Sequence, residues 1–375
     1  MDFAFTEEQL MLLESTRRLM TDQYDAHHRR QILASPEGRS IPVWRQFAEL
    51  GLLGLNVPEE EGGVGGDAIG TLLVSMALGE ALIVEPYGSS AVLASRAIAQ
   101  LGSQAQRSQW LPRLAAGEMI AVVAHEETGM LHSDPPSETR ATLTEGFWIL
   151  QGRKAAVYHA PMADMLLVSA VVAGGAGREC GFFAVPRDTR GVRLEAFTTV
   201  DGQRAANVVL DHARVPTDAR IGTDVSALLP PVLDYGLAAL CAETLGALDR
   251  LLAITLEYTR TRVQFGVPIG RFQALQHRMA DMLTHVEQSR SMTYLAASSC
   301  QSAAAAERTA ALSAAKVVLG RAARFVGQQA IQLHGGMGMS DEMPASHYFK
   351  RLLAFELRGG HTEAHLERYA TLSMN

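Results

Sequence analysis

The stretch Arg262-Val263-Gln264-Phe265-Gly266-Val267-Pro268-Ile269-Gly270-Arg271-Phe272-Gln273 decides the fold, together with Gln332-Leu333-His334-Gly335-Gly336 further along the chain. A guanidinium such as that of Arg262 can hold a pyrophosphate through two parallel hydrogen bonds. Phe265 and Phe272 can cover a ring system, and the paired glycines let a backbone approach a ligand without a Cβ in the way. The order and spacing of these groups within helical sequence predict a dinucleotide-binding segment.

Each segment also has a plainer interpretation. Arg262 and Gln273 are equally compatible with polar residues on helix surfaces, and His334 before Gly335-Gly336 with a helix that ends in glycine. From the residues alone, the dinucleotide-binding interpretation and the plainer one are equally supported.

Composition narrows the class of protein. The chain has 375 residues, of which 47% are hydrophobic and 19% charged, which is typical of a globular protein with a large core. The formal net charge of -7 argues against a nucleic-acid partner. No apolar run reaches the length of a membrane span, and the acidic start Met1–Glu8 lacks the features of a signal peptide. Cys180, Cys241 and Cys300 form no metal or disulfide pattern, so we expect a cytoplasmic protein.

Three stretches of different pattern predict an α+β, mostly helical chain with domains at residues 1–118, 119–229 and 230–375. In the first stretch, Thr6 and Gln9 fit a capping box that begins a helix. In the middle stretch, short β-branched runs are separated by turns. The last stretch is helical again.

Three segments within these stretches predict particular elements of structure. Leu166–Val172, a glycine-rich turn and Gly181–Pro186 predict a β-hairpin. Leucines at helical spacing from Leu233 to Leu252 predict one long helix, and the alanine-rich stretch Ala303–Leu333 predicts another.

Other motifs favour no chemistry. Gly63–Ala68 imitates a Gly-x-Gly-x-x-Ala fingerprint, but Glu59–Glu61 directly before it would repel a pyrophosphate and no βαβ unit surrounds it. We therefore expect a turn there. The chain has no nucleophile elbow and no zinc-protease or Cys-x-x-Cys motif.

Glu243 is conspicuous because it shares a predicted helix face with Leu240 and Ala247. An unpaired carboxylate on an apolar stripe is costly to bury. Either it has a partner, or it lines a cavity and performs chemistry. The sequence leaves both possibilities open.

Several segments resemble the acyl-CoA dehydrogenase family over nearly the whole chain. The similar segments are Asn56–Gly65, Leu111–Glu118, Arg262–Met282 and Gln332–Gly338. Four others are similar to one subgroup, the small-subunit type of pimeloyl-CoA dehydrogenase: Val84–Tyr87, Ala239–Glu243, Gly266–Gly270 and His347–Leu352.

This resemblance implies a helical N-terminal domain, a β-barrel middle domain and a C-terminal four-helix bundle. It implies bound FAD, an acyl-CoA substrate and α,β-dehydrogenation, in which a carboxylate removes the α proton and the flavin takes a β hydride. It also implies an electron-transfer flavoprotein as the acceptor of electrons. The residues that it assigns to FAD are Arg262, Phe265, Phe272, Gln273, Gln332, His334, Gly335 and Gly336.

The catalytic base of the family is missing at both of its usual positions. One position falls on Gly359, which has no acid, although its backbone N–H can still polarise a thioester carbonyl. The other falls on Gly236. Glu243 lies seven residues after Gly236, two turns along the same face, and is the remaining candidate for the base.

The segment that resembles the flavin-ring site also departs from the family. Ala124–Asp134 has one extra residue, and Glu126 replaces a threonine that would bond the flavin ring. Tyr158 replaces a small hydroxyl residue. The resemblance implies that the Arg262 and Gln332 segments bind the adenine end of an FAD whose flavin ring is held by another subunit. Because this chain retains the adenine-end segments and departs from the family at the flavin-ring segment, we infer a hetero-oligomer in which this chain binds the adenine end of a partner's FAD.

That inference competes with Glu243 as the base, since a base needs a flavin ring beside it. The leading function is therefore a subunit of an FAD-dependent acyl-CoA dehydrogenase, and the alternative is a non-catalytic partner that completes a neighbour's FAD site. A homo-oligomer and a flavin-free thioester-binding protein are further possibilities. The resemblance suggests dicarboxylic or bulky, steroid-derived acyl groups, and the small residues at Gly236 and Gly359 would widen the pocket for them.

Overall fold

The computed structural model describes residues 5–129, 135–136, 138–174, 179–300 and 302–374. The chain divides into two compact units, each assembled from separate stretches of sequence. The helical unit comprises Met1–Arg30, Ala68–Ile83 and Leu237–Asn375, and the sheet unit comprises Gln31–Asp67 and Val84–Gly236. The domain bounds taken from the sequence stay a prediction.

The sheet unit is built on one sheet with the strand order β6-β7-β3-β2-β4-β5-β8, in which β1 pairs with β4. Its strands are β1 (Ala121–Ala124), β2 (Arg140–Thr144), β3 (Phe147–Tyr158), β4 (Met165–Val172), β5 (Cys180–Pro186), β6 (Val192–Thr198), β7 (Arg204–Pro216) and β8 (Arg220–Ile221). The predicted hairpin is confirmed, because β4 and β5 pair antiparallel with Leu167 opposite Ala184. Part of the glycine-rich turn between them, residues 175–178, lies outside the described residues.

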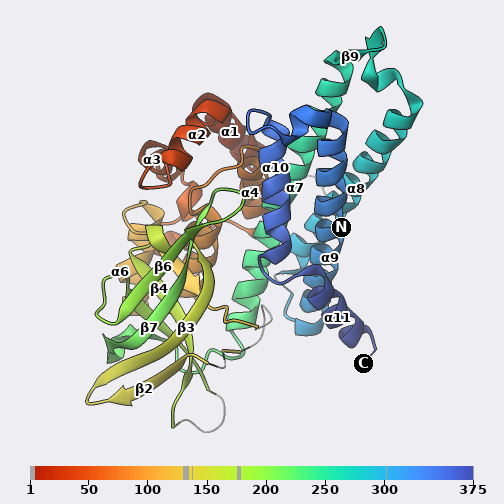
Figure 1. Ribbon diagram of the computed structural model, residues 1–375. Helices are drawn as coiled ribbons and strands as arrows, with labels where there is room; N and C mark the ends of the chain where they lie inside the picture. Colours follow the sequence, from red (N-terminus) through yellow and green to blue (C-terminus); the bar gives the residue numbers. More distant parts are fainter. Residues whose placement is uncertain (1–4, 130–134, 137, 175–178, 301, 375) are drawn as a thin grey trace. The chain divides into compact units, whose positions relative to one another are not determined.

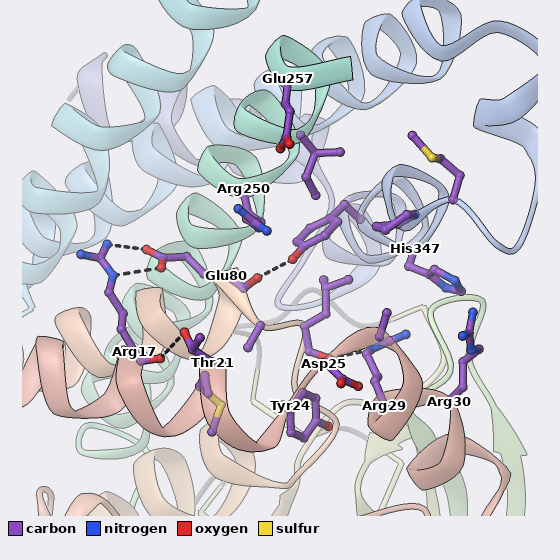
Figure 2. Close-up of a pocket in the computed structure, with 18 of the residues that line it drawn as sticks. Arg17, Thr21, Tyr24, Asp25, Arg29, Arg30, Glu80, Arg250, Glu257 and His347 are labelled. Atoms are coloured by element: carbon purple, nitrogen blue, oxygen red, sulfur yellow. Dashed lines mark hydrogen bonds and ion pairs between the residues drawn. The ribbon is translucent and has the colours of Figure 1, made fainter. Parts of the chain in front are cut away.

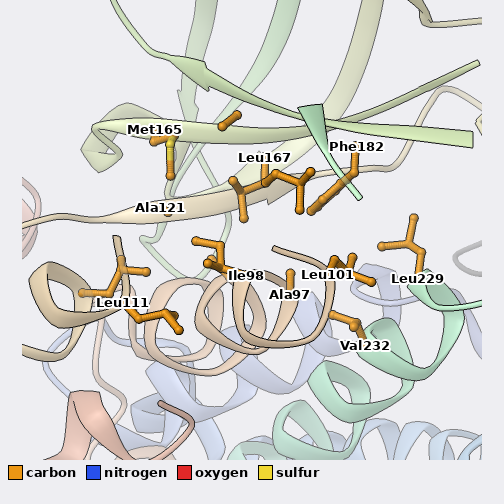
Figure 3. Packing of buried hydrophobic residues seen from close by; sticks show 14 of the residues in the cluster. Ala97, Ile98, Leu101, Leu111, Ala121, Met165, Leu167, Phe182, Leu229 and Val232 are labelled. Carbon is orange, nitrogen blue, oxygen red and sulfur yellow. The ribbon is translucent and has the colours of Figure 1, made fainter. Parts of the chain in front are cut away.

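Two helices cover one face of this sheet, α5 (Ser95–Leu101), which continues a π-helical segment Tyr87–Ala94, and α6 (Gln104–Ala115). The third helix of this unit, α3 (Ile41–Glu49), contacts the short 3-10 helix Leu52–Gly54. Figure 3 shows Ile98 and Leu101 of α5 and Leu111 of α6 facing Leu167 and Phe182 of the sheet. Each large apolar side chain buried in this way contributes roughly 1.5–3 kcal/mol, so this cluster is the core of the sheet unit.

The helical unit is a bundle around α9 (Ala305–His334), which contacts α8, α10 and α11 (Figure 1). The other helices are α1 (Glu7–Gln23), α4 (Ala68–Glu80), α8 (Gln273–Ser299), α10 (Pro344–Leu357) and α11 (Thr362–Ser373). Two helices, α2 (Ala26–Ala34) and α7 (Leu229–Thr261), run from one unit into the other.

The helices predicted from the sequence are confirmed. The two long ones correspond to α7 and α9. The capping box is present as well, because the Gln9 N–H donates to Thr6 Oγ1 at 3.2 Å and the Thr6 N–H donates to Gln9 Oε1 at 3.0 Å. Residues 63–67 have no regular structure before α4 begins at Ala68, as the turn interpretation predicts.

Two glycines bring α4 and α7 unusually close together within the helical unit. A Cβ on Gly79 would lie 1.9 Å from the carbonyl oxygen of Glu243, and a Cβ on Gly246 would lie 1.9 Å from that of Met76. Only hydrogen fits at either position, because a real Cβ needs more than 3 Å. This crossing fixes where Glu243 lies relative to α4.

Candidate functional site

The predicted dinucleotide segment forms a short hairpin between α7 and α8. β9 (Val263–Gln264) and β10 (Val267–Pro268) pair antiparallel, and the turn residues Phe265 and Gly266 have φ of 53° and 79°. Positive φ at both central residues is the geometry of a tight hairpin turn. Figure 1 shows β9 at the tip of the α7–α8 arm, and Phe265 directly follows β9 in the turn.

The side chains of this hairpin face solvent. Phe265 is 92% exposed and Phe272 is 37% exposed, with their ring centroids 6.1 Å apart in an edge-to-face arrangement. Arg262 is also exposed and forms no ion pair with a carboxylate in the described part of the chain. Leaving two phenyl rings in water is unfavourable, so this segment is suited to a surface supplied from outside the unit.

The second predicted segment lies at the end of α9. A Cβ on either Gly335 or Gly336 would meet nothing within 4 Å, and Gly335 has φ of 59°. Both glycines and Gln332 are exposed. The peptide backbone is therefore open to a ligand at this point.

The structure brings the two segments together through Tyr258, which lies one helical turn before Arg262. The Tyr258 ring stacks on that of His334 with centroids 4.4 Å apart, and its hydroxyl donates to the His334 carbonyl at 3.3 Å. Gln273, the first residue of α8, is exposed on the same arm.

His334 differs from the other predicted FAD residues because its side chain is only 2% exposed. Its Nδ1–H donates to the Ala330 carbonyl at 2.8 Å, while Nε2 has no hydrogen-bond partner. Burial lowers the pKa of His334 below its usual 6.5, so the ring is neutral at neutral pH. The buried His334 ring and its hydrogen bond to Ala330 stabilise the end of α9, directly before the exposed glycines.

Glu243 has the partner that its position called for. Its Oε1 accepts a hydrogen bond from Nη1 of Arg351 at 2.6 Å, and Nη1 of Arg358 lies 3.7 Å from the same oxygen. Arg351 is 4% exposed and also donates through Nη2 to the Ile83 carbonyl at 2.7 Å. The carboxylate is thus held by α10, and a proton acceptor at this point would first have to leave Arg351.

Arg351, which holds Glu243, is not predicted by the sequence analysis. Its segment, Tyr348-Phe349-Lys350-Arg351-Leu352, contributes there only a resemblance. An arginine between Tyr348 and Leu352 on an amphipathic helix is a usable signal, because a buried cation requires a carboxylate somewhere in the fold.

Gly359 lies in the connection between α10 and α11, buried and with φ of 65°. Nε2 of His365 lies 2.7 Å from the Gly359 carbonyl oxygen. Lys316 Nζ donates to the Phe355 carbonyl at 2.5 Å, and the Thr362 N–H donates to Glu356 at 2.9 Å. Side chains from α9, α10 and α11 therefore hold the α10–α11 connection that contains Gly359 in place.

The region that resembles the flavin-ring site lies in the sheet unit. The Glu126 carbonyl accepts from the Ala155 N–H at 2.8 Å, and both Glu126 and Tyr158 are half-buried. Next to Glu126, the fully buried pair Glu127–Lys154 is 2.8 Å apart, and burial lowers the pKa of Lys154 to about 8. Residues 130–134 of the predicted segment lie outside the described residues.

The helical unit also contains a cavity of about 860 Å³ that no sequence pattern predicted. It is lined by parts of α1, α2, α4, α7 and α10, including Tyr24, Arg250 and His347 (Figure 2). None of the residues predicted to hold FAD lines this cavity, and neither Glu243 nor Arg351 does.

Two further properties bear on the class of protein. Among the described residues, no helix has both the length and the apolar character needed to cross a membrane. Within that same part of the chain, no group of three or more His, Cys, Asp or Glu side chains is placed to hold a metal ion.

Comparison with known proteins identifies the class. Family models for the N-terminal, middle and C-terminal domains of acyl-CoA dehydrogenase match residues 6–118, 122–212 and 231–372. The chain is 30% identical to acyl-CoA dehydrogenase FadE27 of Mycobacterium tuberculosis, over 98% of this chain and 97% of that protein. It therefore belongs to the acyl-CoA dehydrogenase family, which comprises flavoprotein oxidoreductases of fatty-acid and steroid degradation.

Two solved structures with similar folds are also informative. The ChsE4–ChsE5 complex from Mycobacterium tuberculosis contains a chain with a TM-score of 0.90 and 27% identity, covering 100% of this chain and 99% of that one. A variant of the Tcur3481–Tcur3483 steroid ACAD has a TM-score of 0.89 and 30% identity, with 98% of each chain covered. The predictions of family, fold and enzyme class are confirmed.

Proposed function

We propose that this chain is one subunit of a heteromeric, FAD-dependent acyl-CoA dehydrogenase, in which it holds the adenine end of a partner's FAD. One observation carries the proposal: the α7–α8 arm exposes Arg262 and two phenyl rings, while the paired glycines at the end of α9 are open to a ligand. Relatives named for a two-protein complex support the heteromer.

The residues present fit the adenine and pyrophosphate end of FAD. Arg262 would pair with the pyrophosphate, Phe265 and Phe272 would cover the adenosine, and Gln273 and Gln332 would offer amide donors. Gly335 and Gly336 would let the backbone approach the same end, and His334 would support them from below. When bound, FAD supplies the acceptor for a hydride from the acyl chain, and an electron-transfer flavoprotein would then receive the electrons.

The ring end of FAD fits less well. Glu126 places a carboxylate where a hydroxyl donor is expected, and Tyr158 is larger than the small residue that the family uses. An acceptor facing the flavin carbonyl would be repelled rather than hydrogen-bonded. This mismatch favours a flavin ring held by the partner subunit.

If this chain performs the chemistry itself, Glu243 would take the α proton and the Gly359 N–H would polarise the thioester carbonyl. The competing function is a non-catalytic subunit that completes the neighbour's site. The 2.6 Å hydrogen bond from Arg351 favours this second candidate, because it already engages the carboxylate of Glu243.

The decisive experiment compares the chain expressed alone with the chain co-expressed with its genomic neighbour. Flavin per polypeptide and acyl-CoA dehydrogenation are measured in each preparation. We expect little flavin in the isolated chain, and one FAD for two polypeptides in an active complex. A flavin-replete, active homo-oligomer would overturn the proposal, whereas a colourless complex would favour a flavin-free thioester-binding protein.

A further inference from the structure

We propose that the cavity in the helical unit is a second ligand site, which binds a rigid, apolar carboxylate. The cavity measures about 860 Å³, within the range of roughly 300–1,000 Å³ that is typical of small-molecule sites. Its lining includes none of the residues predicted to hold FAD and neither Glu243 nor Arg351, while Tyr258 both lines the cavity and stacks on His334. The proposed dehydrogenase function therefore leaves it unexplained.

One wall of the cavity is a single face of α7. Arg250, Ile254, Glu257 and Thr261 line it at intervals of three and four residues, with Tyr258 next to Glu257, as expected for side chains on one helix face. The lining also includes Tyr24 and Leu82, which are 5% and 3% exposed. Figure 2 shows Tyr24, Arg250 and Glu257 around this space, with α10 bringing His347 to it.

The floor of the cavity is buried and largely apolar. Met20, Tyr24, Leu82 and Tyr348 are buried residues that contribute to the lining. Tyrosine rings lose little conformational freedom when they contact a ligand. A flat, inflexible hydrocarbon body would bury apolar surface here at low entropic cost.

Three charged groups on the lining are already engaged by the protein. Glu80 accepts from Nε of Arg17 at 2.9 Å. Asp25 accepts from the backbone N–H groups of His27 and His28, both at 2.8 Å. These groups are not available to select a ligand.

Two cations on the lining have no such carboxylate. Neither Arg250 nor Arg30 forms an ion pair with any acid in the described part of the chain, and both are exposed residues of the lining. The Tyr348 hydroxyl donates to the Glu80 carbonyl, and the nearby Arg250 guanidinium opposes the rise in the Tyr348 pKa that burial causes. The exposed guanidinium of Arg250 therefore lies beside the buried Tyr348, where the apolar floor meets the exposed part of the lining.

A guanidinium in that position matches one carboxylate through two parallel hydrogen bonds. Glu257 lies seven residues beyond Arg250 on the same face, about 10 Å along the helix. Its carboxylate disfavours a doubly charged phosphate and can accept a hydrogen bond from a hydroxyl group on the ligand. A singly charged carboxylate on a ring-bearing body therefore fits better than a phosphate.

The test measures binding of cholate, a ring-bearing carboxylate with hydroxyl groups, to the intact purified protein by isothermal titration calorimetry. Methyl cholate lacks the charge, and palmitate lacks the rigid body. We expect cholate to bind about 10- to 100-fold more tightly than methyl cholate, since a charge-assisted hydrogen bond is lost in the ester. Palmitate is expected to bind more weakly than cholate.

Arg250→Gln should abolish the difference between cholate and its ester, while Arg260→Gln, an exposed arginine of α7 outside the cavity, should preserve it. Ala81→Trp, which fills the cavity but keeps Arg250 and Arg30, should remove binding of all probes. Added FAD should not displace cholate.

Three results would overturn the proposal. They are absence of binding in the intact protein, equal affinity for cholate and its ester, and displacement of cholate by FAD, which would place the cavity within the dinucleotide site. Thermal unfolding of each variant shows that a lost signal does not come from a lost fold.

Discussion

The α7–α8 arm and the surroundings of Glu243 lie in the same helical unit, yet they treat charge in opposite ways. Arg262 is exposed beside a phenyl ring that is 92% exposed, and the described chain offers it no carboxylate. Glu243, with a side chain 15% exposed, is held by Arg351 at 2.6 Å. The exposed charge of Arg262, which has no partner within the described chain, indicates an external ligand. The charge of Glu243, which is paired with Arg351, contributes to the stability of the fold.

The largest effect should come from removing the internal partner. Arg351→Met leaves the Glu243 carboxylate without its closest hydrogen bond and removes the contact with the Ile83 carbonyl. Breaking a buried pair in this way costs about 3–5 kcal/mol. Urea unfolding, followed by circular dichroism, should show this loss.

Arg262→Met is the matched control for that experiment, because it removes an exposed arginine with no ion pair. We expect a change within about 0.5 kcal/mol. Similar losses in the two variants would erase the distinction between the two regions.

The next effect concerns the flavin. Arg262→Gln in the co-expressed complex should weaken FAD binding roughly 10- to 100-fold, because a charge-assisted contact with the pyrophosphate is worth about 1.5–3 kcal/mol. Dissociation of FAD is measured by fluorescence on dilution. Arg260→Gln should retain wild-type affinity, and an unchanged affinity in Arg262→Gln would argue against the proposed half-site.

Local patterns in the sequence predicted much of this structure because the interactions behind them are local. The capping box at Thr6, the β4–β5 hairpin and the helices α7 and α9 all follow from spacing within a few residues. The exposed hairpin around Phe265 was not predicted, because this segment was interpreted only as a dinucleotide-binding stretch within helical sequence.

The sequence could not supply contacts between residues that lie far apart along the chain. Glu243 and Arg351 are 108 residues apart, and their pairing depends on how α4, α7 and α10 cross. The cavity likewise requires side chains from α1, α2, α4, α7 and α10. Its lining residues satisfy ordinary helical patterns one at a time, so no motif marks them.

A smaller effect should appear in the pH dependence of stability. Because burial lowers the pKa of His334 below 6.5, the unfolded chain binds a proton more readily than the folded chain. The contribution of neutral His334 is therefore complete above pH 6.5 and is lost as the pH falls through the folded-state pKa. His334→Phe, which keeps a ring against Tyr258, should lose less stability than the wild type between pH 7 and pH 5.

Denaturant unfolding at several pH values provides that comparison. His347, whose pKa is also lowered by burial, is present in both proteins, so the difference between the two curves isolates His334. Parallel curves would mean that His334 carries no penalty for protonation, contrary to its burial.

The smallest effect should be the most informative for function. In the co-expressed complex, we expect Glu243→Gln to keep turnover per flavin within about twofold, because Arg351 engages this carboxylate and the partner would supply the base. A general base contributes typically 10²–10⁴-fold to the rate, so a loss of that size would instead assign proton removal to Glu243. Turnover must be expressed per bound flavin, because the amide leaves Arg351 without a counter-charge and lowers the amount of folded complex.

Arg351→Met provides the complementary measurement, since it frees the carboxylate of Glu243. If Glu243 is the base, that variant retains a competent acid–base group and its turnover per flavin should exceed that of Glu243→Gln. If the carboxylate only pairs with Arg351, the two variants should turn over equally.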